Sequence, residues 1–362
     1  MILILKDFNN KFITDGPSIS IKNGLSQSRL KEKIYIFNRI TEKRSDYINL
    51  FVPKQKIETY YYKNLIDFFF LFIKNFKVFK NSKNIKFNCI YDYIGCLFLT
   101  FLIFLFNISK PKKQYFLRGM ANKNILVHKK ILKIIYLKIL ELLILIKNSS
   151  LVCTSNYEAL SCKYMFSRKF IYEIIYNKVN KKYIKNKFYK IKKKEKELNI
   201  LFLSNITWKK NFDYVYKILV GLDFKVNLSI YGTCFKNKSY FNGLCKKLQK
   251  KHNVIYFGAY KQKNIDNIFR KSHLLFLPTI DENFGHTIVE TLFHYRPCLI
   301  SNNTPWNDLH FYNAGLAVPL EFSETYSNYL RYIYLMNQKK YNQMCLLSFN
   351  YINQKINKNK NF

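Results

Sequence analysis

Arginine and acidic residues are both scarce in this chain of 362 residues, although the chain is strongly basic. Lysine and arginine number 61 against 22 aspartates and glutamates, a net charge of +39, but only eight of the 61 are arginine. Nucleic-acid readers favour arginine because its planar fork pairs with guanine and phosphate, so we expect no nucleic acid partner. Two explanations of the lysine excess stay open: a codon bias toward A and T, and a surface for anionic lipid.

Glycine is rare as well, and its spacing excludes two common phosphate-binding motifs. No two of the ten glycines are closer than eight residues, so neither a GxGxxG fingerprint nor a P-loop is present. The six histidines show no metal-ligand spacing, and Asp-x-Asp is absent, so we expect neither a metal nor another cofactor. The eight cysteines form no C-x-x-C pair and most lie in apolar stretches, which favours free thiols in a reducing cytosol.

One uncharged run is long enough to raise the question of a membrane. Residues 93–109 contain no charge over 17 positions, the lower limit for a transmembrane helix, and Lys110 follows at once. We expect a buried or half-buried helix within an α/β domain, and a membrane-anchored protein stays the alternative. The apolar N-terminus lacks a basic region before it, so it indicates a first strand and not a signal peptide.

The C-terminal half alternates short β-type runs with helix-length segments. Such alternation is typical of a parallel sheet wrapped by helices, whose ligands bind at the carboxyl ends of the strands. The predicted strands are 198–204, 225–232, 254–258, 274–279, 297–302 and 315–319, and the predicted helices are 211–222, 239–251, 261–272, 284–295 and 305–310.

The N-terminal half is compatible with the same α/β class. We expect strands at its start and at 33–37, 114–118 and 150–155, and helices through 19–30 and 131–147. A lysine-rich run at 177–197 is expected to be a solvated linker, with a polybasic lipid contact as the alternative. We therefore place one domain at 1–187 and a second at 188–362, whose Lys- and Asn-rich last 25 residues form a frayed basic tail.

The strongest candidate site begins at Asp281 and continues to Glu290. Glu282 follows a predicted strand and Glu290 lies eight residues later in the next helix, about 12 Å away if all eight residues are helical. That is roughly the reach from the sugar to the ribose of a nucleotide-sugar, and the helix start would favour its diphosphate. By spacing alone, two ordinary surface glutamates remain the alternative.

The order of residues adds a resemblance. The E-x(7)-E run followed by Thr304-Pro305-Trp306 resembles the family 4 glycosyltransferases, and more closely their bacterial surface-polysaccharide members. Three earlier segments match that family in the same order, and the similarity covers about 15–335: these are the entry loop Asp15-Gly16-Pro17, Leu117-Arg118-Gly119-Met120 and Thr154-Ser155-Asn156-Tyr157-Glu158.

The resemblance implies a GT-B fold, which has two Rossmann-like domains facing across a cleft. It implies transfer of a sugar from a UDP- or GDP-linked donor, with retention of configuration and without a metal. Lys210 would bind the diphosphate, Glu282 the donor hexose and Glu290 the ribose, and Arg118 would contact the phosphate or the acceptor. Further donor-binding positions would be Gly16, Asn205, Asn283, Phe284, Gly285, His286 and Thr304.

The expected partners follow from the same resemblance: a nucleotide-sugar, a glycan or glycolipid acceptor, and an anionic membrane surface. We expect a cytoplasmic enzyme, peripherally bound to the inner face of the cell membrane, that builds surface glycans such as lipopolysaccharide, capsule or exopolysaccharide. Asn205 stands where the family has an arginine, which removes one cation from the leaving-group site. The alternative is therefore a catalytically impaired GT-B protein that binds or scaffolds an active transferase.

Overall fold

The chain divides into two compact units, Met1–Lys178 and Val179–Phe362. The computed structural model describes residues 2–6, 34–39, 57–89, 93–117, 130–143, 148–166, 171–175, 177, 188–193, 195–234, 236–260 and 264–358. The sequence placed the domain boundary after residue 187, and the residues between the two boundaries, 179–187, lie outside these described ranges. Each unit is therefore treated by itself.

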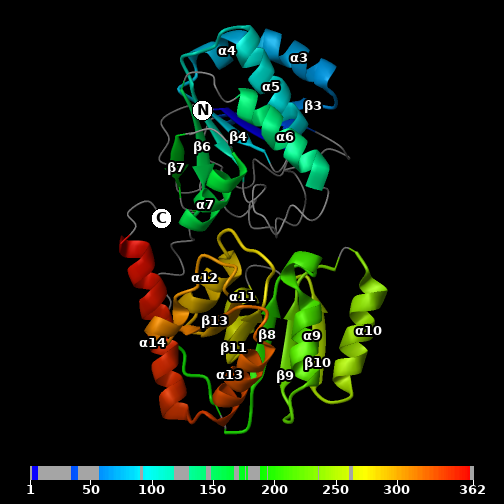
Figure 1. Ribbon diagram of the computed structural model, residues 1–362, viewed down its shortest axis with the longest axis vertical. Coiled ribbons are helices and arrows are strands. Elements are labelled where there is room, and N and C mark those ends of the chain that lie inside the picture. Colours follow the sequence, from blue (N-terminus) through cyan, green and yellow to red (C-terminus); the bar gives the residue numbers. More distant parts are fainter. Residues whose placement is uncertain are drawn as a thin grey trace. The chain divides into compact units, whose positions relative to one another are not determined.

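Unit 1 contains a seven-stranded parallel sheet in the order β3-β2-β1-β4-β5-β6-β7 (Figure 1). The strands are β1 Ile2–Lys6, β2 Ile34–Arg39, β3 Ile57–Tyr62, β4 Asn84–Asn88, β5 Lys112–Phe116, β6 Ser149–Cys153 and β7 Tyr172–Ile174. The helices are α3 Leu65–Lys74, α4 Phe76–Asn81, α5 Tyr93–Leu105, α6 Lys130–Leu143 and α7 Asn156–Met165.

The uncharged run of unit 1 forms α5, which is half-buried and so confirms the helix that the sequence predicted. Cys96, Leu99 and Ile103 are fully buried, whereas Phe104 and Leu105 are more than half exposed. In the described ranges, no helix combines the length and the apolar character needed to cross a bilayer. The helix predicted through 19–30 lies outside those ranges.

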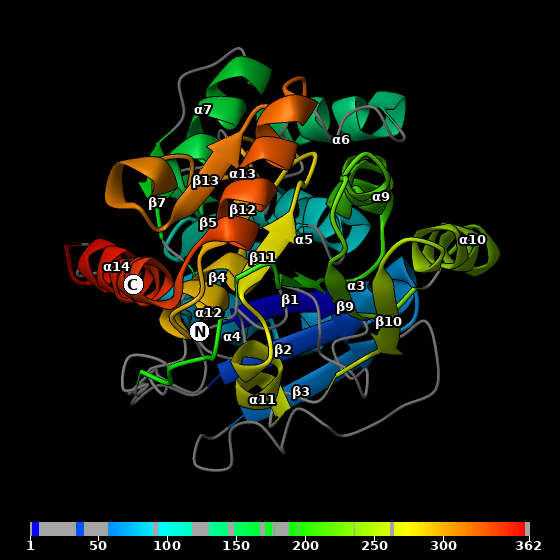
Figure 2. The same cartoon turned by 90° about the horizontal axis from the view of Figure 1, so that it is seen from below.

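Unit 2 contains a six-stranded parallel sheet in the order β10-β9-β8-β11-β12-β13, with helices on both faces (Figures 1 and 2). The strands are β8 Asn199–Leu203, β9 Asn227–Tyr231, β10 Asn253–Gly258, β11 Leu274–Leu277, β12 Cys298–Ser301 and β13 Gly315–Val318. The helical segments are η2 Trp208–Lys210, α9 Phe212–Val220, α10 Lys238–Gln249, α11 Ile265–Arg270, α12 His286–Phe293, η4 Leu309–Tyr312, α13 Ser323–Leu335 and α14 Gln338–Lys358.

Burial follows the position of each strand in this sheet. All four residues of β11 and of β12 are buried, as expected for central parallel strands covered on both faces. The edge strand β10 instead exposes Ile255 and Phe257. Every strand predicted for the C-terminal half is confirmed, whereas the helix expected at 305–310 is only the short η4 turn at Leu309–Tyr312.

Two expectations about basic segments of unit 2 were wrong. Residues 338–358 are not a frayed tail, because Tyr341, Cys345 and Ile352 of α14 are buried against the core. The linker is not fully solvated either: Lys193 is buried and donates to the Tyr334 carbonyl at 3.1 Å. In both segments, widely spaced apolar residues among the lysines determine the packing.

Candidate donor-binding site

The candidate site lies where the strand order of unit 2 reverses direction. From β8 the chain runs outward through β9 and β10, then returns to β11 on the other side of β8. Ligands of open α/β sheets bind at such a switch point, outside the carboxyl ends of the strands. The loop after β8 carries Lys209 and Lys210, and the loop after β11 carries Asp281 and Glu282.

Two lysine–carboxylate pairs join these loops. The Lys209 Nζ lies 3.1 Å from an Asp281 carboxylate oxygen, and the Asp281 side chain is fully buried. Lys210 pairs in the same way with Glu282, whose side chain is 17% exposed. The site therefore holds two cations and two anions, and the partly exposed Lys210–Glu282 pair is one in which an incoming anionic ligand can replace the carboxylate as the lysine partner.

The Glu282 carboxylate is held in its ionised form. Burial by itself raises the pKa of Glu282, but the ammonium groups of Lys210 and Lys209, with His286 nearby, outweigh that effect and hold its pKa at about 2. At neutral pH the side chain is an acceptor only, so it suits hydroxyl donors such as those of a sugar ring.

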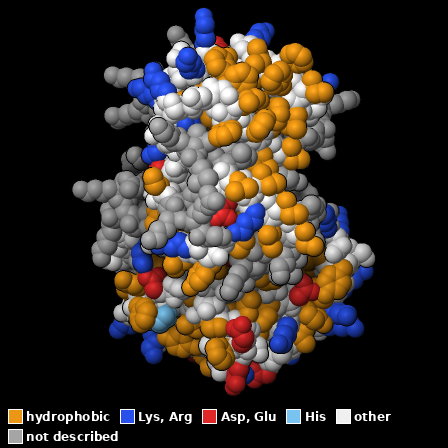
Figure 3. Space-filling model, turned by 45° about the horizontal axis from the view of Figure 1, so that its top comes forward, with side chains coloured by type: hydrophobic (Ala, Val, Ile, Leu, Met, Phe, Trp, Pro, Cys, Tyr) orange, Lys and Arg blue, Asp and Glu red, His pale blue; other side chains and the backbone are white. Residues whose placement is uncertain are grey.

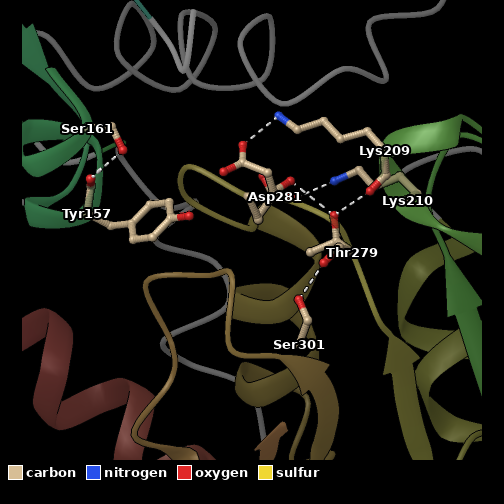
Figure 4. Close-up of polar contacts among 8 residues, drawn as sticks. Tyr157, Ser161, Lys209, Lys210, Thr279, Asp281 and Ser301 are labelled. Carbon is tan, nitrogen blue, oxygen red and sulfur yellow. Dashed lines mark hydrogen bonds and ion pairs between the residues drawn. The ribbon is translucent and has the colours of Figure 1, made fainter. Parts of the chain in front are cut away.

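Backbone hydrogen bonds fix the two loops against each other. The Lys209 carbonyl accepts from the Ile280 N–H and from the Thr279 hydroxyl, each at 2.8 Å. The Ser301 hydroxyl at the end of β12 donates to the Thr279 carbonyl (Figure 4). Asn211, in the left-handed conformation after η2, donates its amide to the Pro278 carbonyl at 3.1 Å. The lysines are thus positioned by main-chain contacts that do not depend on their own charge.

Gly285 turns the chain into α12, which starts at His286. Its φ of +75° is strained for other residues, and an added Cβ would lie 2.9 Å from the Ile288 Cδ1. Gly285 has no side chain to cap the helix, and the positive end of the α12 dipole favours an anionic ligand here. Asn283 and Phe284 precede this turn, and the Phe284 ring meets the His286 ring edge-on at 4.7 Å.

Hydrogen bonds join the loop Thr304-Pro305-Trp306 to this turn. The Trp306 indole N–H donates to the Phe284 carbonyl, and the Asn303 carbonyl accepts from the Glu282 N–H at 2.9 Å. Thr304 is fully buried, and its hydroxyl accepts from the Trp306 N–H at 3.1 Å. In the structure Thr304 therefore shapes the loop that carries Trp306.

Glu290 lies in α12 and is 5% exposed. The assumption of eight helical residues between Glu282 and Glu290 was wrong, because the chain becomes helical only at His286 and bends at Gly285. Tyr260, just after β10, is close enough for the Glu290 charge to add to burial in raising the pKa of the Tyr260 phenol. The ring of Tyr260 also meets that of Tyr231 edge-on at 6.5 Å.

The side chain of Asn205 stabilises the loop in which it lies. Its side-chain oxygen accepts from the Thr233 N–H at 3.2 Å, which ties the loop after β8 to the loop after β9. The two backbones approach closely at Gly232, where an added Cβ would lie 1.9 Å from the Ser204 carbonyl oxygen. The asparagine replaces a cation with a structural hydrogen bond.

The structure thus brings most of the predicted donor-site residues to adjoining loops at one edge of the unit 2 sheet. Gly16 and Arg118 lie outside the described ranges, so their placement stays a prediction. Sequence reasoning placed Asp281 at the start of the candidate site but gave it no role, and it missed Tyr260. Within the described part of the chain, no three His, Cys, Asp or Glu side chains are grouped as metal ligands.

Solved structures with the same architecture define the fold. The structure of Anabaena Alr3699/HepE with UDP and glucose superposes with a TM-score of 0.72 at 13% identity, covering 98% of this chain and 94% of that one. Sucrose-phosphate synthase from Thermosynechococcus elongatus gives 0.70 at 13% identity, over 98% and 94%. WaaG, a glycosyltransferase involved in lipopolysaccharide biosynthesis, gives 0.63 at 12% identity, over 98% and 95%. The fold is GT-B, with two Rossmann-like domains, as predicted.

The sequence of the C-terminal part is similar to one family. Residues 184–344 match the family model of the glycosyl transferases group 1. A search of curated protein sequences finds no match to the chain.

Proposed function

We propose that the protein is a glycosyltransferase that moves a sugar from a nucleotide-sugar to a glycan or glycolipid acceptor with retention of configuration. The observation that carries the proposal is the pair of lysine–carboxylate contacts at the switch point of the unit 2 sheet. The match of residues 184–344 to the group 1 glycosyl transferases and the similar structures solved with UDP or UDP-glucose support the donor class.

In this proposal Lys210 leaves Glu282 when the donor binds and pairs with the diphosphate. Negative charge on the diphosphate grows as the glycosidic bond breaks, and a fixed ammonium group beside the positive end of the α12 dipole stabilises that charge. Lys209 stays with the buried Asp281 and adds positive potential at longer range. The positive charge of Lys209, on the same loop as Asn205, thus partly replaces the cation lost with Asn205.

The two glutamates would bind the two sugar rings of the donor. Glu282, released from Lys210, is ionised and accepts hydrogen bonds from hydroxyl groups of the transferred sugar. Glu290, buried in α12, accepts from the ribose hydroxyls. Bidentate acceptance by a buried carboxylate discriminates strongly against a ligand that lacks the hydroxyl groups.

We propose surface-glycan assembly on the cytoplasmic side of the membrane as the setting. The resemblance of the E-x(7)-E and Thr-Pro-Trp segments to surface-polysaccharide enzymes supports this role. All eight cysteines are free thiols, which fits a reducing compartment. The acceptor would then be a lipid-linked or polysaccharide chain.

A nucleotide screen tests the donor site. The full chain is heated with UDP, GDP and their sugar conjugates, and sugar transfer or donor hydrolysis is measured in parallel. We expect one nucleotide series to stabilise the protein, and Lys210→Ala or Glu290→Gln to lower kcat/KM by about 100-fold or more. Lys217→Ala and Glu324→Gln, exposed positions on α9 and α13, are the matched controls.

The outcomes separate the proposal from its rival. Nucleotide binding that depends on Glu290, without transfer or hydrolysis of any donor, would support the impaired GT-B binding protein instead. Full activity in both site variants would remove Lys210 and Glu290 from the mechanism. If no nucleotide stabilises the chain, the assignment of these loops as a donor site is wrong.

A further inference from the structure

Three helices of unit 1 present large apolar side chains to solvent. Six such side chains on α3, α5 and α6 are at least 60% exposed, whereas isolated exposed residues of this kind are ordinary on a soluble protein. They are Ile66, Phe70, Phe104, Leu105, Ile131 and Leu142. We call this surface the helical apolar face.

The exposed residues form stripes on adjacent helices. Ile66 and Phe70 are four residues apart on α3, so they lie on one side of that helix. The same helix buries Phe68 and Phe72 on its other side. Helix α5 contacts both α3 and α6, and Figure 3 shows hydrophobic side chains gathered on this part of unit 1. The stripes therefore adjoin one another.

The charges around the helical apolar face are almost all positive. Lys74 ends α3, and exposed lysines continue along α4 and into the segments that follow α4 and α5. Asp67 is half-buried and accepts from the Lys63 N–H at 3.1 Å, so it helps to form the start of α3. The exposed lysines of this rim are Lys74, Lys77, Lys80, Lys83 and Lys110.

Exposed apolar side chains surrounded by lysines favour one kind of partner. Interfaces between proteins are depleted in lysine, whereas an apolar surface with a lysine rim complements an anionic bilayer. Helix α5, with 13 residues, is about 20 Å long and shorter than the roughly 30 Å hydrocarbon core, so it would lie on the bilayer and not span it.

We propose that the helical apolar face binds the surface of an anionic phospholipid bilayer. The aromatic and aliphatic side chains enter the boundary between headgroups and acyl chains, and the lysine rim meets the lipid phosphates. This surface belongs to unit 1 alone and does not depend on donor binding or sugar transfer. A protein bound in this way would be at the same surface as a glycolipid acceptor.

Vesicle flotation with the purified full chain tests the proposal. We expect binding to phosphatidylcholine vesicles that contain phosphatidylglycerol, weaker binding to pure phosphatidylcholine, and a loss of affinity as salt rises. The double variant Phe70→Gln/Phe104→Gln should lower the partition coefficient by about tenfold or more. The matched control is Phe311→Gln/Phe322→Gln, two exposed phenylalanines of unit 2.

A second variant tests the charges. Lys77→Glu/Lys80→Glu replaces two exposed lysines of α4 and should weaken binding to the anionic vesicles only. Binding by the Phe70/Phe104 variant equal to that of the unchanged protein would overturn the proposal, as would equal binding to both vesicle types. A dimer in solution that this variant converts to monomer, with vesicle binding unchanged, would assign the face to a second copy. Nucleotide-induced stabilisation of unit 2, measured alongside, reports separately on the donor site.

Discussion

Lys210 and Glu282 form an ion pair that is both a structural contact and a candidate reaction site. The depressed pKa of Glu282, about 2 against 4.5, means that the folded state favours the ionised carboxylate. The pair therefore stabilises the fold at pH values above about 4.5, and this contribution is lost as pH falls from 4.5 toward 2. The side chain is mostly buried, so screening by solvent is limited.

Lys210→Met should lower the stability of unit 2 at pH 7 by about 1–3 kcal/mol, because it leaves the Glu282 carboxylate with Lys209 alone nearby. The difference from the unchanged protein should shrink as pH falls below 4.5, since Glu282 then becomes protonated in the variant. Thermal unfolding at several pH values measures the effect, with Lys217→Met as the surface control. A difference that stays constant down to pH 3 would show that the loss arises from packing and not from charge.

At the scale of elements, the parallel sheet of unit 2 was predictable because its strands are short apolar runs between helix-length segments. Strands β11 and β12 are apolar throughout, so they were readily recognised. In unit 1, strands β3 and β4 were not predicted, because Tyr, Lys and Asn interrupt their apolar residues. Helix α14 was missed for a similar reason: its buried Tyr341, Cys345 and Ile352 are hidden in the sequence among Lys and Asn.

The two glutamates of the candidate site were predictable from the sequence, but the lysine–carboxylate pairs were not. The E-x(7)-E spacing identified Glu282 and Glu290, yet contact between Lys209 and Asp281 depends on the strand order, which places β8 beside β11. For Thr154, Ser155 and Glu158, the sequence identified the residues, and the structure shows what they do. The resemblance singled them out, and the structure shows a helix cap in which the Glu158 carboxylate accepts from the Thr154 N–H and hydroxyl.

The close approach of the loops after β8 and β9 can be tested by a substitution at Gly232. Gly232 has a φ of +137°, and a Cβ there would lie 1.9 Å from the Ser204 carbonyl oxygen, so Gly232→Ala must displace the loop that holds Asn205. We expect a loss of more than about 1 kcal/mol in stability and weaker nucleotide binding. Gly243→Ala on α10, where nothing lies within 4 Å of the added Cβ, should leave both unchanged or raise stability. Equal behaviour of the two variants in thermal unfolding would contradict this account.

At the scale of the whole molecule, the two units differ in what they offer a partner. Unit 2 carries the charged loops of the candidate donor site, and unit 1 carries the helical apolar face with its lysine rim. Only two tryptophans occur in the chain, Trp208 and Trp306, and both belong to unit 2. Tryptophan fluorescence therefore reports on unit 2 selectively, whereas circular dichroism reports on both units.

Trp208 directly precedes Lys209 and is 46% exposed, so a nucleotide bound at Lys210 should change its emission. At a nucleotide concentration of about 100 times Kd, binding contributes roughly 2.7 kcal/mol and should raise the tryptophan-detected unfolding midpoint by about 5–10 °C. Trp208→Phe should abolish the change in emission at low temperature but keep the shift in midpoint, which is then followed through the buried Trp306. A midpoint that does not move with the nucleotide that binds would place the binding site outside unit 2, because stabilisation by a ligand must appear in the unit whose folded state binds it.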